Sequence, residues 1–238
     1  MMAGGTGINR RLTMKKLITS ILFCLPIFAI ASEPSNSNDK GLKILPMNQM
    51  NLPQPIKDNF YSNQHDIARR GYTVSNNQTA EFLLTINNHA AQEIQQYKSL
   101  TDNPYDTHLK SNYSEIKLSF PFSGLKDIDH KDIIGYAALG SYGNGWDGLR
   151  IFFNSNIGVC SYSRMSVQAM YMTEESTEYL VNKNPTEKSI DGNEKTGLLY
   201  SVSWYKDSTL YILECANYKF DPKIMPSLID LANKIDRN

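Results

Sequence analysis

The residues best suited to acid–base chemistry lie in a charged stretch near the middle of the chain. Residues 127–132 read Asp-Ile-Asp-His-Lys-Asp, so His130 directly follows Asp129. A carboxylate beside an imidazole can orient the ring, and histidine titrates near neutral pH. The pair is therefore the candidate for a catalytic base in a hydrolase. The alternative is a charged loop before a strand, and the sequence favours it because no complete catalytic constellation accompanies the pair.

The motifs of the common catalytic and cofactor-binding classes are incomplete. Residues 139–143 read Leu-Gly-Ser-Tyr-Gly, one residue short of the G-x-S-x-G nucleophile elbow, and a strand is expected to follow. The chain has no G-K-[ST] triplet, no H-E-x-x-H pair and no G-x-G-x-x-G that opens a helix. The acids around His130 lack the glycine and the distant glutamate of an EF-hand loop. We therefore expect no cofactor and no metal site, and we favour a non-catalytic protein.

A second group of functional candidates occupies a glycine-rich turn. Residues 141–148 read Ser-Tyr-Gly-Asn-Gly-Trp-Asp-Gly. Two aromatic side chains beside a carboxylate at a loop tip can stack on a sugar or anchor a protein partner. This predicts Tyr142, Asn144, Trp146 and Asp147 as binding residues of a carbohydrate or cell-wall module. The alternative is purely structural, because Asn-Gly favours a tight hairpin and Trp146 would then fold back onto the sheet.

The first 31 residues have the features of a secretory signal peptide. They contain four basic residues and no acidic residue, followed by an apolar run over 17–31 that ends in Ala-Ile-Ala. The run is shorter than the roughly 20 residues that span a bilayer. We expect a protein exported to the periplasm or secreted, without a stable membrane span after cleavage. An uncleaved anchor and a translation start at Met14 are the alternatives.

Cleavage of that leader changes the cysteine count and the net charge of the chain. Removal of residues 1–31 leaves Cys160 and Cys215, and an even count in an exported chain predicts a disulfide, with two free thiols as the alternative. The remaining chain has 20 basic and 24 acidic residues. This weak negative charge gives no support to nucleic acid as a partner.

Three segments and an α+β fold are predicted for the whole chain. Residues 1–31 form the signal peptide, 32–60 a tether with an extended proline-containing part, and 61–238 a single domain. A capping pattern at Ser75–Gln78 and an apolar stripe predict a helix over 76–99, and a second stripe predicts a C-terminal helix after Pro222. Pro226 suggests that this last helix becomes regular one turn later.

Between these helices, about six antiparallel strands are expected to form a meander sheet that both helices pack against. Alternating residues indicate strands at 116–120, 133–142, 149–153, 159–162, 198–204 and 210–215, with turns at 143–145, 156–158 and 206–208. Residues 183–195 are expected to form an exposed loop. The function predicted from the sequence is an exported, non-catalytic binding or envelope protein with an unidentified protein or glycan partner.

Overall fold

A run of β-strands in the second half of the chain dominates the structure. The computed structural model describes residues 41–97 and 107–237. Its strands are β1 (Gly41–Leu45), β2 (Thr73–Val74), β3 (Ile133–Tyr142), β4 (Trp146–Ser155), β5 (Gly158–Ser166), β6 (Ala169–Thr173), β7 (Glu178–Val181), β8 (Asn184–Asn193), β9 (Gly197–Lys206) and β10 (Thr209–Asn217). Its helices are α1 (Gln54–Arg70), α2 (Gln78–Ile86), α3 (Ala90–Tyr97) and α4 (Ile224–Ile235), with 3-10 turns η3 (Met47–Gln49), η4 (Tyr113–Glu115) and η5 (His130–Asp132). The predicted signal peptide lies outside the described residues.

The predicted α+β fold is confirmed. The main sheet has the order β2-β8-β9-β10-β5-β4-β3, and β7 also pairs with β8, so it contains eight strands rather than about six. All of these pairs are antiparallel except β2 with β8. Two meanders, β3-β4-β5 and β8-β9-β10, therefore meet at the pair β5–β10. The strands β1 and β6 form a separate parallel pair.

Three of the four turns within the two meanders lie where the sequence predicts them. Tight turns follow β3, β4 and β9 at the predicted places. In the β9–β10 turn, Asp207 has φ 50° and Ser208 has φ 57°. Two consecutive left-handed residues are the signature of a type I′ turn, whose twist matches that of the flanking strands.

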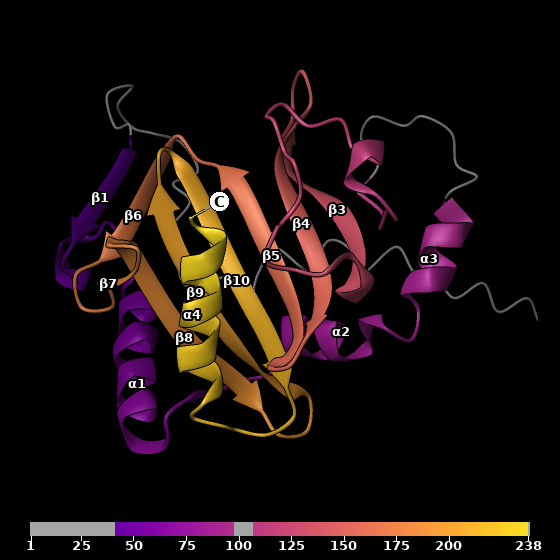
Figure 1. The fold of residues 1–238 in the computed structure, drawn as a ribbon. Coiled ribbons are helices and arrows are strands. Elements are labelled where there is room, and N and C mark those ends of the chain that lie inside the picture. The colour runs from indigo at the N-terminus through magenta and orange to yellow at the C-terminus, as the bar shows by residue number, and fades with distance from the viewer. Residues whose placement is uncertain (1–40, 98–106, 238) are drawn as a thin grey trace, which may run out of the picture.

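Helices cover the two faces of the main sheet (Figure 1). The C-terminal helix α4 lies across β9 and β10, and its apolar stripe joins Val202, Trp204 and Leu213 in one core cluster. On the opposite face, α2 packs against β9, β10 and β5. The predicted C-terminal helix is thus confirmed, but it includes Pro226 in its first turn. A first-turn N–H has no intrahelical acceptor, so proline costs the helix little there.

The helix predicted over 76–99 is interrupted. It forms α2 and α3, separated by residues 87–89. The side chain that caps α2 is Asn77, whose Oδ1 accepts a hydrogen bond from the Ala80 N–H at 3.0 Å. Ser75 was the expected cap, but its hydroxyl donates to Asp191 instead, at 3.2 Å.

Three further expectations were wrong. A helix, α1, begins at Gln54 inside the segment expected to be extended, because Pro53 and Pro55 stand at its cap and first turn, where proline is tolerated. Residues 184–193 form β8 rather than an exposed loop, since pairing with β9 outweighs their polar composition. The strand expected at 116–120 makes only one bridge, between Leu118 and Trp146.

The sheet face opposite α4 carries a buried polar band between two apolar clusters. At one end, α2 packs on Leu199 and Ala216, and at the other end β6 packs on Leu210 and Ile212. Between these ends the face presents Glu214, Arg150 and serines of β5, β8 and β9, and Glu214 is only 1% exposed. An unpaired buried polar group costs about 1–3 kcal/mol, against a total stability of about 5–15 kcal/mol. The partners of these side chains therefore matter to the whole molecule.

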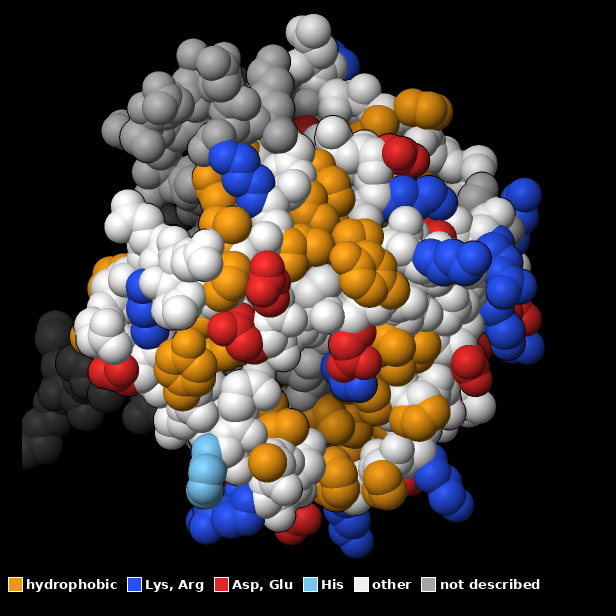
Figure 2. Space-filling view, turned by 90° about the vertical axis from the view of Figure 1, so that its left-hand side faces the viewer, with side chains coloured by type: hydrophobic (Ala, Val, Ile, Leu, Met, Phe, Trp, Pro, Cys, Tyr) orange, Lys and Arg blue, Asp and Glu red, His pale blue; other side chains and the backbone are white. Residues whose placement is uncertain are grey.

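The side of the molecule formed by α1, β1 and β7 exposes hydrophobic side chains among charged ones (Figure 2). Tyr61 of α1 and Tyr179 of β7 are exposed to 47% and 62%. Isolated exposed aromatics are common on protein surfaces and define no patch by themselves. Within residues 41–97 and 107–237, no helix combines the length and the apolar character that a membrane crossing needs.

Candidate functional site

The candidate acid–base pair lies in η5, at the surface. Asp129 caps this turn by accepting the Lys131 N–H at 3.1 Å, and its carboxylate also pairs with Lys131 Nζ at 2.9 Å. The hydrogen bonds from Lys131 hold the pKa of the Asp129 carboxyl below its usual range. The His130 ring is exposed, and no side chain among the described residues forms a hydrogen bond with it. The Asp129 carboxylate thus binds Lys131 and does not orient the His130 ring, as a catalytic base would require.

The predicted binding loop is built largely into the fold. Trp146 is 8% exposed and joins the main core cluster, with its ring edge-on to Tyr142 at 5.5 Å between centroids. The Asp147 carboxylate accepts the Ser141 N–H at 2.7 Å. It lies so close to Gly140, which has φ +81°, that a Cβ there would clash. Of the four predicted residues, only Asn144 is fully exposed, and a binding role for the loop stays a prediction.

The predicted disulfide is confirmed. Cys160 of β5 and Cys215 of β10 are bonded and lie directly opposite each other in the ladder, with their Cα atoms 4.0 Å apart. Both residues are fully buried. The bond therefore crosses the junction of the two meanders and contributes to stability rather than to a surface site.

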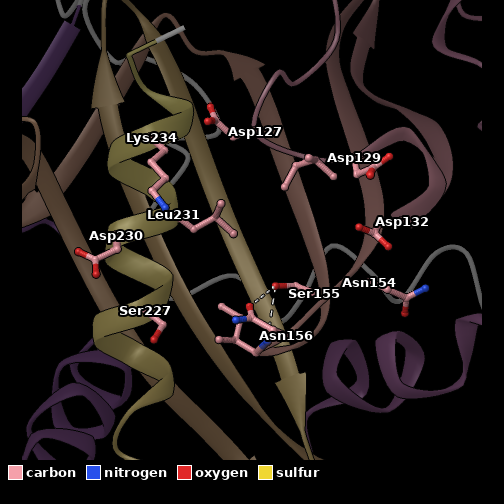
Figure 3. A pocket seen from close by; sticks show the side chains of 12 residues that line it. Asp127, Asp129, Asp132, Asn154, Ser155, Asn156, Ser227, Asp230, Leu231 and Lys234 are labelled. Atoms are coloured by element: carbon pink, nitrogen blue, oxygen red, sulfur yellow. Dashed lines mark hydrogen bonds between the residues drawn. The ribbon is translucent and has the colours of Figure 1, made fainter.

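A hollow beside α4 gathers polar side chains from three separate segments (Figure 3). It has a volume of about 410 Å³. One wall is α4, and the other is formed by the η5 segment and the turn between β4 and β5. The lining comprises Asp127, Ile128, Asp129, Asp132, Asn154, Ser155, Asn156, Ile157, Ser227, Asp230, Leu231 and Lys234.

The chemistry of this hollow favours a cationic group. Four aspartates and one lysine line it, and Asp129 is already paired with Lys131, so the remaining aspartates leave the lining negative. Its amides and hydroxyls can accept hydrogen bonds. No group of three or more histidine, cysteine or acidic side chains within the described parts of the chain is arranged to hold a metal ion. An ammonium or guanidinium group matches the hollow better than a bare ion, because it can share several separate acceptors.

Only part of this hollow was visible in the sequence. The sequence indicates a charged stretch around His130 and a turn at Asn156. Their approach to Asp230 and Lys234 depends on how α4 crosses the sheet, which local pattern does not specify. The spacing of Ser227, Asp230 and Lys234 by three and four residues is the one signal that places them on a common helix face.

No protein-family model, no curated protein and no solved structure matches this chain.

Proposed function

We propose that this chain is an exported, non-catalytic binding protein, and that the acidic hollow beside α4 binds a basic segment of a partner protein. The observation that carries the proposal is that four aspartates from two separate segments line one hollow of about 410 Å³. A lysine or arginine side chain fits this charge and these acceptors. The buried Cys160–Cys215 bond supports export, because disulfides persist in oxidising compartments.

The two alternative functions have less support. A hydrolase based on His130 would need a group that orients the ring and a nucleophile within hydrogen-bond reach. A carbohydrate module based on the loop would depend mainly on Asn144, since Trp146 is almost entirely in the core.

Titration of the purified, oxidised protein with an arginine-rich peptide tests the proposal, with a glutamate-rich peptide of equal length as the comparison. We expect saturable binding of the basic peptide only, weakening as salt is raised, because exposed charges are screened. The double variant Asp132→Asn, Asp230→Asn should weaken binding about 10-fold, equivalent to about 1.4 kcal/mol. Mass spectrometry of the native product should show the leader removed and the cysteines oxidised.

Asp207→Asn provides the matched control, because it removes one exposed aspartate from the β9–β10 turn, which does not line the hollow. It should bind the peptide as the wild type does. Equal binding by the wild type and the double variant would contradict the proposed site, and an intact leader would contradict export.

A further inference from the structure

The parallel pair β1–β6 lies at the margin of the molecule, and its outer strand β1 has a strand neighbour on one side only (Figure 1). On one face of the pair, Leu42 and Ile44 join the apolar cluster around Leu210 and Ile212 of the main sheet. On the other face, Tyr171 of β6 joins the cluster formed with η3 and α1. Parallel strands are usually covered on both faces in this way, so the part of the pair that remains open is the edge of β1.

The hydrogen-bond pattern shows which backbone groups of β1 point outward. The Gly41 N–H donates to the carbonyl that precedes β6 at 2.8 Å, and the Leu45 carbonyl accepts from the N–H that follows β6 at 3.0 Å. Alternate residues of a strand direct their backbone groups to the same side of the ladder. Gly41, Lys43 and Leu45 therefore bond to β6, and the N–H and C=O groups of Leu42 and Ile44 point away from it.

The edges of the main sheet are covered more completely than this one. At one edge, β8 is covered by β7 and β2, which have only four and two residues. At the other edge, Lys110 bridges β3 at Tyr136. By contrast, within residues 41–97 and 107–237 no backbone group of Leu42 or Ile44 forms a hydrogen bond. Proteins normally cover or shorten an edge, because an open strand accepts another chain, so β1 is a site for an added strand.

Lys43 determines which kind of strand fits this edge. Its ammonium lies on the face of Tyr171, 5.9 Å from the ring centroid. An antiparallel strand centred on Lys43 would pair with all four outward groups of Leu42 and Ile44. If that strand were β1 of a second copy, the two Lys43 side chains would lie directly opposite each other, and like charges are unfavourable there. An acidic residue at the same position makes the contact attractive.

We propose that the outer edge of β1 binds an extended segment of a partner protein as an added strand, with an acidic residue opposite Lys43 between two apolar residues. In strand addition, backbone hydrogen bonds provide affinity and alternate side chains provide specificity. The two apolar side chains would lie beside Leu42 and Ile44 and continue their apolar face. This surface is separate from the acidic hollow, whose lining includes no residue of β1 or β6.

Titration of the intact oxidised protein with the capped peptide acetyl-Thr-Ile-Glu-Val-Thr-amide, followed by amide hydrogen exchange in NMR, tests this proposal. We expect saturable binding, with the amides of Leu42 and Ile44 exchanging at least about 10-fold more slowly when the peptide is bound. The same peptide methylated on the backbone nitrogens of its isoleucine and valine should not bind, because those nitrogens are the donors to β1.

Reversal of one charge tests the chemistry of the partner. Lys43→Glu should weaken binding of the glutamate peptide about 5-fold and favour the peptide with lysine in place of glutamate by a similar factor. Lys195→Glu is the matched control, since Lys195 is an exposed lysine of the β8–β9 turn. It should bind both peptides as the wild type does, and circular dichroism checks that both variants fold.

The contrary outcomes are specific to this edge. Absence of saturable binding, unchanged exchange at Leu42 and Ile44, or binding of the methylated peptide would each overturn the proposal. Protection of these two amides in the free protein that increases with protein concentration would also overturn it, because a second copy would then be the occupant. Equal binding of the glutamate peptide by Lys43→Glu and the wild type would overturn the acidic character assigned to the partner.

Discussion

The buried carboxylate of Asp191 shows how one residue connects the sheet to a helix. It accepts hydrogen bonds from the Asn77 side-chain amide and from the Ser75 hydroxyl, and Asn77 in turn caps α2. Burial raises the pKa of the Asp191 carboxyl above its ordinary value of 3.8, although these two donors oppose the shift. The cap of α2 is thus held by a group that is costly to ionise where it lies.

This raised pKa predicts a stability difference that depends on pH. Between 3.8 and the raised value the folded protein binds more protons than the unfolded chain, so stability falls as pH rises through that range. Asp191→Asn keeps an oxygen acceptor for Asn77 without the charge. We therefore expect its stability relative to the wild type to increase between about pH 3 and about pH 7. Urea unfolding at both pH values measures this, with Asp207→Asn as the control for the loss of a charge. An equal stability difference between Asp191→Asn and the wild type at both pH values would contradict the prediction.

At the scale of elements, the type I′ turn between β9 and β10 contains strain that a substitution can remove. Ser208 has φ 57°, and serine adopts this left-handed region at a cost that glycine avoids. Ser208→Gly should stabilise the protein by about 0.5–1 kcal/mol. Thermal unfolding measures the change.

Ser166→Gly is the control for this turn, because Ser166 pairs with Thr209 in the same ladder and its φ is not positive. Glycine there lacks the conformational benefit and should destabilise the strand by a few tenths of a kcal/mol to about 1 kcal/mol. If both substitutions change stability in the same direction, the turn is not the source of the effect.

The elements that could be predicted from the sequence are those whose signals are local. The turn at 143–145, the turn at 206–208 and the stripe of the C-terminal helix depend on neighbouring residues alone, and all three were correct. The strand β8 could not be recognised, because its polar residues resemble a loop until β9 provides the pairing. The serines of β5 and β9 alternate with apolar residues, as solvent-facing positions do, and only the folded structure shows that they are buried.

At the scale of the molecule, the junction β5–β10 decides whether the two meanders act as one unit. Strands β3 to β5 are consecutive in the chain, as are β8 to β10. Strands β5 and β10 are neighbours in the sheet, but β6 to β9 separate them along the chain. Because closing such a loop costs conformational entropy, we expect this pairing to form late in folding. The Cys160–Cys215 bond lies in this ladder, so it constrains the antiparallel pairing that has the longest connection in the main sheet.

The bond should therefore stabilise the whole molecule. It closes a loop of 55 residues, for which chain entropy gives about 4 kcal/mol. Urea unfolding of the wild type, oxidised and then reduced with dithiothreitol, measures this without removing an atom from the core. The double variant Cys160→Ala, Cys215→Ala should lose more than reduction does, because both sites are fully buried and alanine leaves a cavity. Because the crosslink ties both meanders, the near-ultraviolet and far-ultraviolet circular dichroism signals of the oxidised protein should be lost together as urea is raised. Equal urea midpoints for the oxidised and reduced forms would show that the bond does not constrain this junction.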